Sequence, residues 1–242
     1  MSFLPLISDK RINKKVRIIY FIVQRIGSLS ILAGGLIRDS NGVLWKWICF
    51  GLLLKASLAP LHFWGPGLLI NLGKIKAFIF LTWQKVLPLC LLFITTSKFF
   101  IKCLTILNLL IAARCRLGSK HLYVLLFFSR LMHVGLVLTR PSSVATQYFG
   151  LYCLCCAPVF IIRLLGIDLS LLILNLAGLP PLTGFFMKLM VLQSLSVDFG
   201  FMVLRLSLLL LFAYLRLFLF LPINKNINRS TILVISLGLL FY

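Results

Sequence analysis

Four ionisable side chains lie far inside long apolar stretches of this sequence, where they could carry protons. They are Lys55, Lys85, His133 and Lys188. A charged side chain at the centre of a bilayer costs about 2.5–3.5 kcal/mol on insertion scales, so such residues usually belong to an ion or proton pathway. Burial disfavours the charged form of an amine, and a nearby negative charge favours it. We therefore expect these four residues to form a proton relay.

A second use is open to each of these residues. A lysine can extend its amine to a lipid headgroup, and a buried histidine can simply hydrogen-bond a neighbouring helix. Lys55 and Lys85 are about ten residues from the nearest segment end, roughly 15 Å at helical rise, which is too far for comfortable extension. Lys188 is nearer an end. The relay is therefore favoured most strongly at Lys55 and Lys85.

Prolines beside two of these lysines predict interrupted helices. Pro60 follows Lys55, and Pro180 and Pro181 precede Lys188. Proline removes a backbone hydrogen bond and clashes with the preceding turn. Carbonyls freed at membrane depth are tolerated only where they face protein or water. Broken helices in corresponding positions of two halves are typical of inverted-repeat transporters, so the pattern indicates a hydrated, ion-handling axis.

The elements that must position these residues are apolar segments of membrane-spanning length. Hydrophobic residues make up 61% of the 242 residues and charged residues 12%, whereas a soluble domain is about a quarter charged. The run from Leu204 to Leu215 does not alternate as a barrel strand would. About nine segments approach the ~20 residues of a spanning helix. They run roughly over 16–37, 43–64, 75–96, 99–115, 121–139, 146–166, 168–194, 199–221 and 231–242.

The sequence therefore predicts an all-α membrane protein with about nine transmembrane helices, two of them broken. We expect a single transmembrane domain over residues 1–242, with a basic N-terminal extension at 1–15. Lys and Arg in the loops fall mainly on the side of the N-terminus, which places that side on the cytoplasm-equivalent face.

Charge and motif content exclude several functions. The 25 Lys and Arg against four Asp and no Glu would suggest nucleic-acid binding in a soluble protein, but here the basic residues mostly end apolar runs. We expect no nucleic-acid partner. The seven cysteines are expected to be small buried hydrophobic residues and not metal ligands. No nucleotide-binding or hydrolytic motif is present, and no metal or cofactor is predicted.

Three blocks of sequence resemble one known family. They are Leu54–Pro66, with Ala-Pro-Leu-His-Phe-Trp inside it; Leu81–Pro88, with Thr-Trp-Gln-Lys; and Asn175–Lys188. Together they resemble the subunit 2 family of mitochondrial NADH:ubiquinone oxidoreductase, respiratory complex I, in an N-terminally short form. Weaker similarity extends over most of the chain.

The resemblance implies an antiporter-like inverted-repeat bundle that lacks its first helices. It implies a multi-pass protein of the mitochondrial inner membrane, with its N-terminus on the matrix side. The expected role is proton translocation in the membrane arm during NADH:ubiquinone oxidoreduction, without a redox centre or cofactor on this chain. The implied partners are lipids and the other membrane-arm subunits.

Carried over by position, the resemblance makes Lys55 the central lysine of the first broken helix. Lys85 would be the connecting lysine of the next helix, and Lys188 the lysine of the second broken helix. His133 matches a histidine of the family.

Two departures from the family bear on these roles. The family pairs its central lysine with a buried glutamate on an earlier helix, and this sequence contains no glutamate. Either a separate chain supplies the missing helices and the acidic partner, which we favour, or the relay lacks its carboxylate. Tyr123 and Val124 replace a basic pair, which affects a loop contact only.

Two other functions stay open. One is a structural, non-pumping subunit that scaffolds the membrane arm. The other is an independent cation/proton antiporter, which would be expected to carry its own membrane carboxylates.

Overall fold

The computed structural model describes residues 14–36, 43–117, 121–139, 142–161, 167–179, 182–193 and 195–220. Within these ranges the regular structure is helical, with no strand. The helices are α2 (Lys14–Leu36), α3 (Val43–Ala56), α4 (Trp64–Ile70), α5 (Lys74–Leu81), α6 (Trp83–Thr95), α7 (Lys98–Leu117), α8 (Leu122–Leu138), α9 (Ser142–Ile161), α10 (Ile167–Ala177), α11 (Thr183–Leu192) and α12 (Val197–Phe220).

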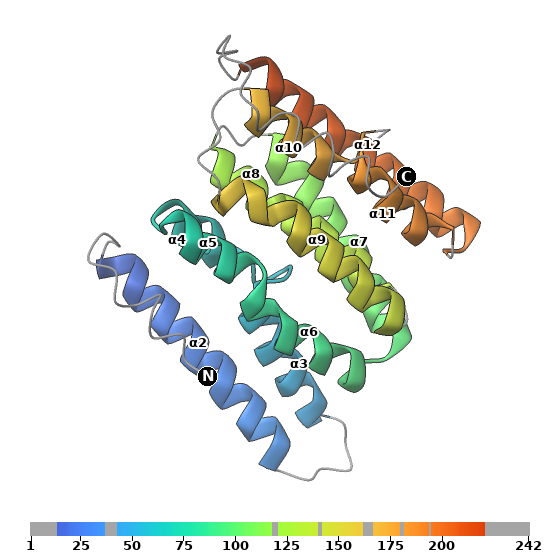
Figure 1. Cartoon of the computed structure of the whole chain (residues 1–242). Helices are drawn as coiled ribbons and strands as arrows, with labels where there is room; N and C mark the ends of the chain where they lie inside the picture. Colours follow the sequence, from blue (N-terminus) through green and yellow to red (C-terminus); the bar gives the residue numbers. More distant parts are fainter. Residues whose placement is uncertain are drawn as a thin grey trace.

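The helices lie side by side in a bundle, with α2 along one edge and α10 to α12 along the opposite edge (Figure 1). Helix α8 lies in the interior, and every side chain from Leu125 to Leu138 is buried. A helix that is apolar all round is buried in this way. Two helical stretches in the described residues are long and apolar enough to cross a membrane, Lys14–Leu36 and Lys74–Thr95.

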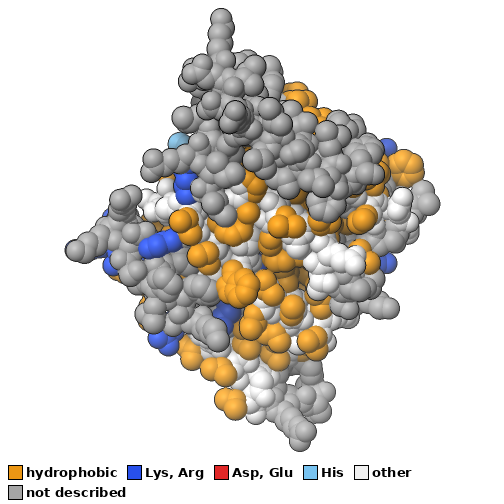
Figure 2. Space-filling model, viewed as in Figure 1, with side chains coloured by type: hydrophobic (Ala, Val, Ile, Leu, Met, Phe, Trp, Pro, Cys, Tyr) orange, Lys and Arg blue, Asp and Glu red, His pale blue; other side chains and the backbone are white. Residues whose placement is uncertain are grey.

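The outer surface is strongly apolar. Hydrophobic side chains cover much of the described surface on the face shown in Figure 2. Helix α2 contributes many of them, including Ile22, Leu29 and Leu32, which are 48%, 64% and 59% exposed. A contiguous apolar surface of this kind is typical of a membrane or subunit interface.

Small residues set the distance between α2 and α3. The buried side of α2 carries Gly27, Ser30 and Gly34. A Cβ placed on Gly51 of α3 would lie 2.7 Å from the Gly27 carbonyl oxygen and 2.3 Å from the Ser30 hydroxyl. Close approach of helix backbones through small residues is the usual packing of helices in membranes.

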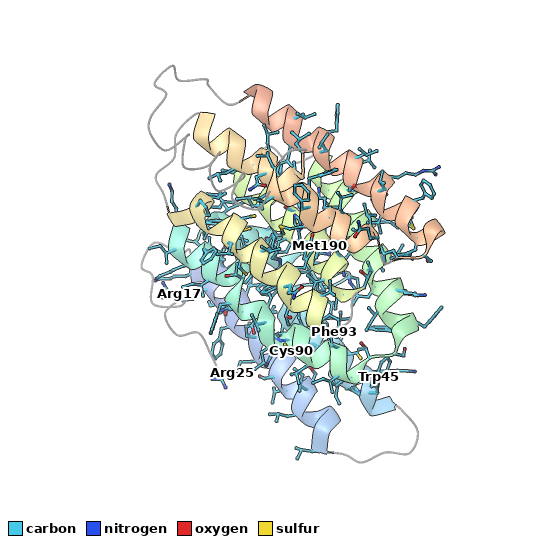
Figure 3. All side chains as sticks on the ribbon, turned by 45° about the vertical axis from the view of Figure 1, so that its right-hand side comes forward. Arg17, Arg25, Trp45, Cys90, Phe93 and Met190 are labelled. Carbon is cyan, nitrogen blue, oxygen red and sulfur yellow. The ribbon has the colours of Figure 1, made fainter. Side chains whose placement is uncertain are left out.

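Helices α3 and α6 run antiparallel. The Trp45 indole, near the start of α3, donates to the carbonyl of Thr95 at the end of α6. At the other end of the pair, the Lys85 amine in the first turn of α6 contacts the Lys55 carbonyl in the last turn of α3. Figure 3 labels Trp45 together with Cys90 and Phe93 of α6. The antiparallel arrangement places the last turn of α3 next to the first turn of α6.

Three predicted segments each contain two helices in the structure. The segment 43–64 is two helices, because α3 ends at Ala56 and α4 begins at Trp64, beyond Pro60. We call residues 57–63 the α3–α4 break; the peptide bond between Ala59 and Pro60 within it is cis. The segment 75–96, predicted as one continuous helix, is interrupted at Thr82, where φ is −107° and ψ is −75°.

The segment 168–194 is the pair α10 and α11, joined around Gly178. Pro180 and Pro181, the other predicted helix-breaking residues, lie outside the described residues. The predicted last segment, 231–242, and the basic extension up to residue 13 also lie outside them.

Candidate functional site

The end of α3 forms a tight C-terminal cap. The amide of Ser57 donates to the Leu54 carbonyl at 3.2 Å, and the amide of Leu58 donates to the Leu53 carbonyl at 3.0 Å. Ser57 has a left-handed backbone, with φ of 48°. This pair of bonds around a left-handed residue is a Schellman motif. It uses the last free amides and leaves the carbonyls of residues 55–57 available.

Lys85 binds two oxygens at this helix end. Its Nζ lies 3.1 Å from the Lys55 carbonyl oxygen and 3.1 Å from the Ser57 hydroxyl. The side chain is 1% exposed. The rings of Phe80 and Trp64 lie 4.5 Å and 5.4 Å from Nζ. Carbonyl ends of a helix and aromatic faces both stabilise a cation, so this position suits an ammonium group.

Arg130 contacts the same helix end, and sequence reasoning missed it. Its Nη2 lies 3.1 Å from the Ala56 carbonyl oxygen, 3.4 Å from the Ser57 carbonyl oxygen and 3.0 Å from the Ser57 hydroxyl. The side chain is fully buried in α8. Arg130 stands at the centre of the predicted segment 121–139, so the criterion that selected the lysines, a charge in mid-segment, identifies it as well.

Lys55 lies in the last turn of α3, not at the middle of a helix as the sequence suggested. Its backbone carbonyl belongs to the cluster described above, but its side chain packs along α2. A Cβ on Gly27 would lie 2.9 Å from Lys55 Cγ. The absence of a side chain at Gly27 therefore gives Lys55 its place on α2.

The end of α10 repeats the cap seen at α3. The Gly178 amide donates to the Asn175 carbonyl at 3.0 Å, and the Leu179 amide donates to the Leu174 carbonyl at 3.5 Å. Gly178 has φ of 76°, so a left-handed residue again ends the helix. The Lys188 amine donates to the carbonyl of Ala177, the last residue of α10. A lysine from a following helix thus caps each of the two helix ends.

The Asn175 side chain joins α10 to α11. Its Oδ1 accepts hydrogen bonds from the Gly184 amide at 2.8 Å and the Thr183 hydroxyl at 3.0 Å. A Cβ on Gly184 would lie 1.8 Å from the Asn175 carbonyl oxygen. Close approach at Gly184 places α11, and with it Lys188, against the end of α10.

His133 lies in the interior with two tyrosines of α9. Its Nδ1 is 2.7 Å from the Tyr148 hydroxyl, and its ring centroid is 4.9 Å from that of Tyr152. His133 follows Arg130 by three residues, so the two share one side of α8. The structure therefore joins Lys85, the end of α3, Arg130 and His133 in one region, and it places Lys188 at the end of α10.

Pro60 lies in the α3–α4 break, where side chains of other residues hydrogen-bond the backbone groups of Ala59 and Pro60. The amide of Ala59, just before it, donates to Asn108 Oδ1 of α7 at 2.9 Å. The carbonyl of Pro60 lies 3.2 Å from His62 Nδ1. The break is therefore held by side chains of α6, α7 and α8, which the positions of the prolines alone could not indicate.

No protein-family model matches the sequence. The chain is 30% identical to NADH-ubiquinone oxidoreductase chain 2 of Anopheles gambiae, an alignment that covers 90% of this chain and 75% of the relative. It is 25% identical to the protein of the same name from Lumbricus terrestris, over 96% of this chain and 81% of the relative.

The fold is similar to chains of two solved membrane complexes. A chain of respiratory complex I from Thermus thermophilus superposes with a TM-score of 0.78 and 20% identity, covering 98% of this chain and 69% of that one. A chain of the Mrp complex from Dietzia gives 0.75 and 15%, covering 87% and 51%. Both structural comparisons show the same fold. The sequence match to the Anopheles gambiae protein extends over most of both chains. The chain belongs to the NADH-ubiquinone oxidoreductase chain 2 family.

Proposed function

We propose that this chain is a proton-translocating, antiporter-like subunit in the membrane arm of respiratory complex I, in the mitochondrial inner membrane. Protons pass through Lys55, Lys85, His133 and Lys188 while the complex transfers electrons from NADH to ubiquinone, and this chain carries no redox centre. The observation that carries the proposal is the placement of the Lys85 and Lys188 amines at the carbonyl ends of α3 and α10.

Those helix ends allow a buried amine to hold a proton without a carboxylate beside it. The C-terminus of a helix carries partial negative charge, and its last carbonyls accept hydrogen bonds from a cation. An ammonium group satisfies them better than a neutral amine, because bonds from an ionised donor are shorter and stronger. The proton can leave when the surrounding charge changes, because neighbouring charges shift the balance between the charged and neutral forms of a buried amine.

His133 and Tyr148 provide the next step. A neutral imidazole donates from one ring nitrogen and accepts at the other, and a tyrosine hydroxyl does both. A proton taken by one ring nitrogen of His133 can therefore be matched by release from Nδ1 toward the Tyr148 hydroxyl, 2.7 Å away. This exchange moves a proton across the ring without moving the helix.

Buried polar atoms around the α3–α4 break support a hydrated path. Among the described residues, Gln84 Oε1, Trp64 Nε1 and Asn108 Nδ2 are buried without a hydrogen-bond partner. Buried polar groups are nearly always paired with protein or with ordered water. We place water molecules at these atoms, where they would connect the amines to one another.

A negative partner for the amines comes, in this proposal, from another subunit. The sequence has no glutamate, and none of its four aspartates lies in the middle of an apolar segment. Arg25 is exposed near the middle of α2 and lies over Phe21 at 4.9 Å (Figure 3). A cation exposed in the middle of a spanning helix needs a partner. We propose a separate chain at α2 that supplies a carboxylate near Lys55.

The proposal also covers topology. Helices α3–α4 and α10–α11 are the two broken helices of an inverted repeat, with the N-terminus on the matrix side.

The second candidate function is a structural subunit that moves no protons. It is favoured by one observation, that the sequence has no glutamate and none of its four aspartates lies in the middle of an apolar segment.

Lys85→Met separates the two functions. The variant keeps an unbranched side chain and removes the ammonium. In the assembled complex in proteoliposomes, the ratio of protons pumped to NADH oxidised should fall by more than about tenfold, because a positioned proton-transfer group typically contributes about 10²–10⁴-fold. Lys55→Ala should act in the same direction.

Lys46→Met is the matched control, since Lys46 is an exposed lysine of the same helix as Lys55. It should pump as the unaltered complex does. A complex of normal size on a native gel with normal pumping in both Lys85→Met and Lys55→Ala would refute proton transfer and leave the structural function.

A further inference from the structure

Arg130 is a buried cation that the proposed path does not use. It lies at the centre of α8 with a fully buried side chain, and it reaches the end of α3 through one nitrogen, Nη2. Its Nε and Nη1 have no hydrogen-bond partner among the described residues. An arginine that served only to satisfy buried carbonyls would be expected to have its own donors paired. Its contacts therefore call for a second explanation.

Comparison of the two helix ends supplies one. Both α3 and α10 end in the same cap, and in both the carbonyl of the last helical residue accepts a hydrogen bond from a buried cation. At α10 that cation is Lys188, bound to Ala177. At α3 it is Arg130, bound to Ala56 at 3.1 Å. The two cations differ in chemistry, since a guanidinium group keeps its charge in proteins and an amine can lose its proton.

Because Arg130 keeps its charge, the proton at the end of α3 has to be carried by a second cation, Lys85. Lys85 lies next to Arg130. Both side chains bind the Ser57 hydroxyl, Lys85 Nζ at 3.1 Å and Arg130 Nη2 at 3.0 Å. Two positive charges that bind the same hydroxyl repel each other, and the repulsion is stronger in a protein interior than in water. The sequence has no glutamate, and none of its four aspartates lies in the middle of an apolar segment, where it could offset the repulsion.

We propose that Arg130 is a positioning residue of the proton path, which fixes the end of α3 through Ala56 and Ser57 and, as a permanent charge across the shared hydroxyl, drives Lys85 to pass its proton on. The inference rests on the proposed function. Arg130 itself exchanges no proton. Its charge makes the protonated state of Lys85 transient, so that Lys85 transmits protons and does not store them.

The test compares Arg130→Gln with Arg130→Lys in the intact complex. Glutamine keeps hydrogen-bonding capacity and removes the charge, whereas lysine keeps the charge and loses the planar fork. The ratio of protons pumped to NADH oxidised should fall about tenfold in Arg130→Gln, because a unit charge close to a proton-carrying amine is lost. In Arg130→Lys it should stay within about twofold of the unaltered complex. A merely structural contact would give the reverse order or no difference.

Arg114→Gln is the matched control, since Arg114 is exposed near the end of α7. It should not change pumping. Normal pumping in Arg130→Gln, or an equal loss in Arg130→Lys and Arg130→Gln, overturns the inference.

Ser57→Gly is the second variant, and it decides the matter if the Arg130 variants do not assemble. It removes the CH2OH side chain that carries the shared hydroxyl, and glycine accepts the left-handed backbone at this position. Pumping should fall about threefold, as for the net loss of one ordinary hydrogen bond. Unchanged pumping in Ser57→Gly overturns the inference.

Lys85→Met, measured in parallel, distinguishes the two proposals. Normal pumping in Lys85→Met refutes the proton path itself. Loss of pumping in Lys85→Met together with normal pumping in Arg130→Gln refutes only the role of Arg130.

Discussion

Hydrogen bonds connect the buried polar side chains of α8 to the neighbouring helices. His133 has Tyr148 as a partner at 2.7 Å, and Ser129 accepts a hydrogen bond from Tyr214 of α12. Both contacts are buried, so each is stronger than it would be in water and more costly to leave half-made. The chemistry of the path therefore depends on a few oxygen and nitrogen atoms in fixed positions.

Tyr148→Phe tests the contact with His133. The change removes one hydroxyl and keeps the ring, so the packing against α8 stays intact. We expect pumping to fall about two- to tenfold, because a lost hydrogen bond between neutral groups costs about 0.5–1.5 kcal/mol net. Proton pumping and NADH oxidation in the assembled complex measure it.

Tyr123→Phe is the control, since Tyr123 lies partly exposed near the start of α8 and contacts Phe160 by its ring. Equal pumping in Tyr148→Phe and the unaltered complex would exclude Tyr148 from the path.

Helix ends and helix contacts decide where the lysines lie. Sequence reasoning found the lysines from their position in apolar runs, but it placed Lys55 in mid-helix. The structure ends α3 at Ala56 because Ser57 adopts a left-handed backbone and the cap forms there, four residues before Pro60. A left-handed serine has no clear signal in sequence, whereas Gly178 at the end of α10 does.

Gly51→Ala tests the close packing of α2 on α3. The added methyl group would meet the Gly27 carbonyl oxygen at 2.7 Å, a backbone atom that cannot move alone. The two helices must separate, and we expect thermal stability of the assembled complex to fall. Gly35→Ala is the control on α2, since a Cβ there meets nothing within 4 Å. A thermal midpoint for Gly51→Ala equal to that of Gly35→Ala would contradict this packing.

Gly178→Ala tests the cap at α10. A Cβ there would lie 2.9 Å from Cδ, Cε and Nζ of Lys188, and the left-handed backbone adds strain of about 1 kcal/mol. We expect the Lys188 amine to be displaced from the Ala177 carbonyl and pumping to fall, with assembly largely retained. Gly150→Ala on α9, where a Cβ meets nothing within 4 Å, should pump normally. Undiminished pumping in Gly178→Ala would show that the precise position of Lys188 does not matter.

The bundle as a whole was largely predictable from the sequence. Eight of the nine expected apolar segments correspond to helices or helix pairs in the described residues, because runs of apolar side chains of bilayer length have few other stable forms. Contacts between distant segments were not predictable. Arg130 and the Ala56 carbonyl are 74 residues apart, and nothing in either local sequence records their meeting.

Arg25→Leu tests whether another subunit covers α2. The change removes an exposed cation and would favour membrane insertion by about 2.5–3.5 kcal/mol if this side of α2 faced lipid. We expect the opposite result, less of the chain in the complex, because the acidic partner loses its cation. A native gel measures the fraction assembled. Arg114→Gln should assemble normally, and full assembly of Arg25→Leu would show that α2 faces lipid.

The burial of α8 on all sides has a mechanical consequence. Arg130 hydrogen-bonds the end of α3 and His133 hydrogen-bonds Tyr148 of α9, and the two residues are three positions apart on the same helix. A rotation of α8 about its own axis by one residue, about 100°, would break both hydrogen bonds together. A rotation of α8 therefore breaks both contacts in one movement, and the orientation of this helix links the α3 side of the bundle to the α9 side.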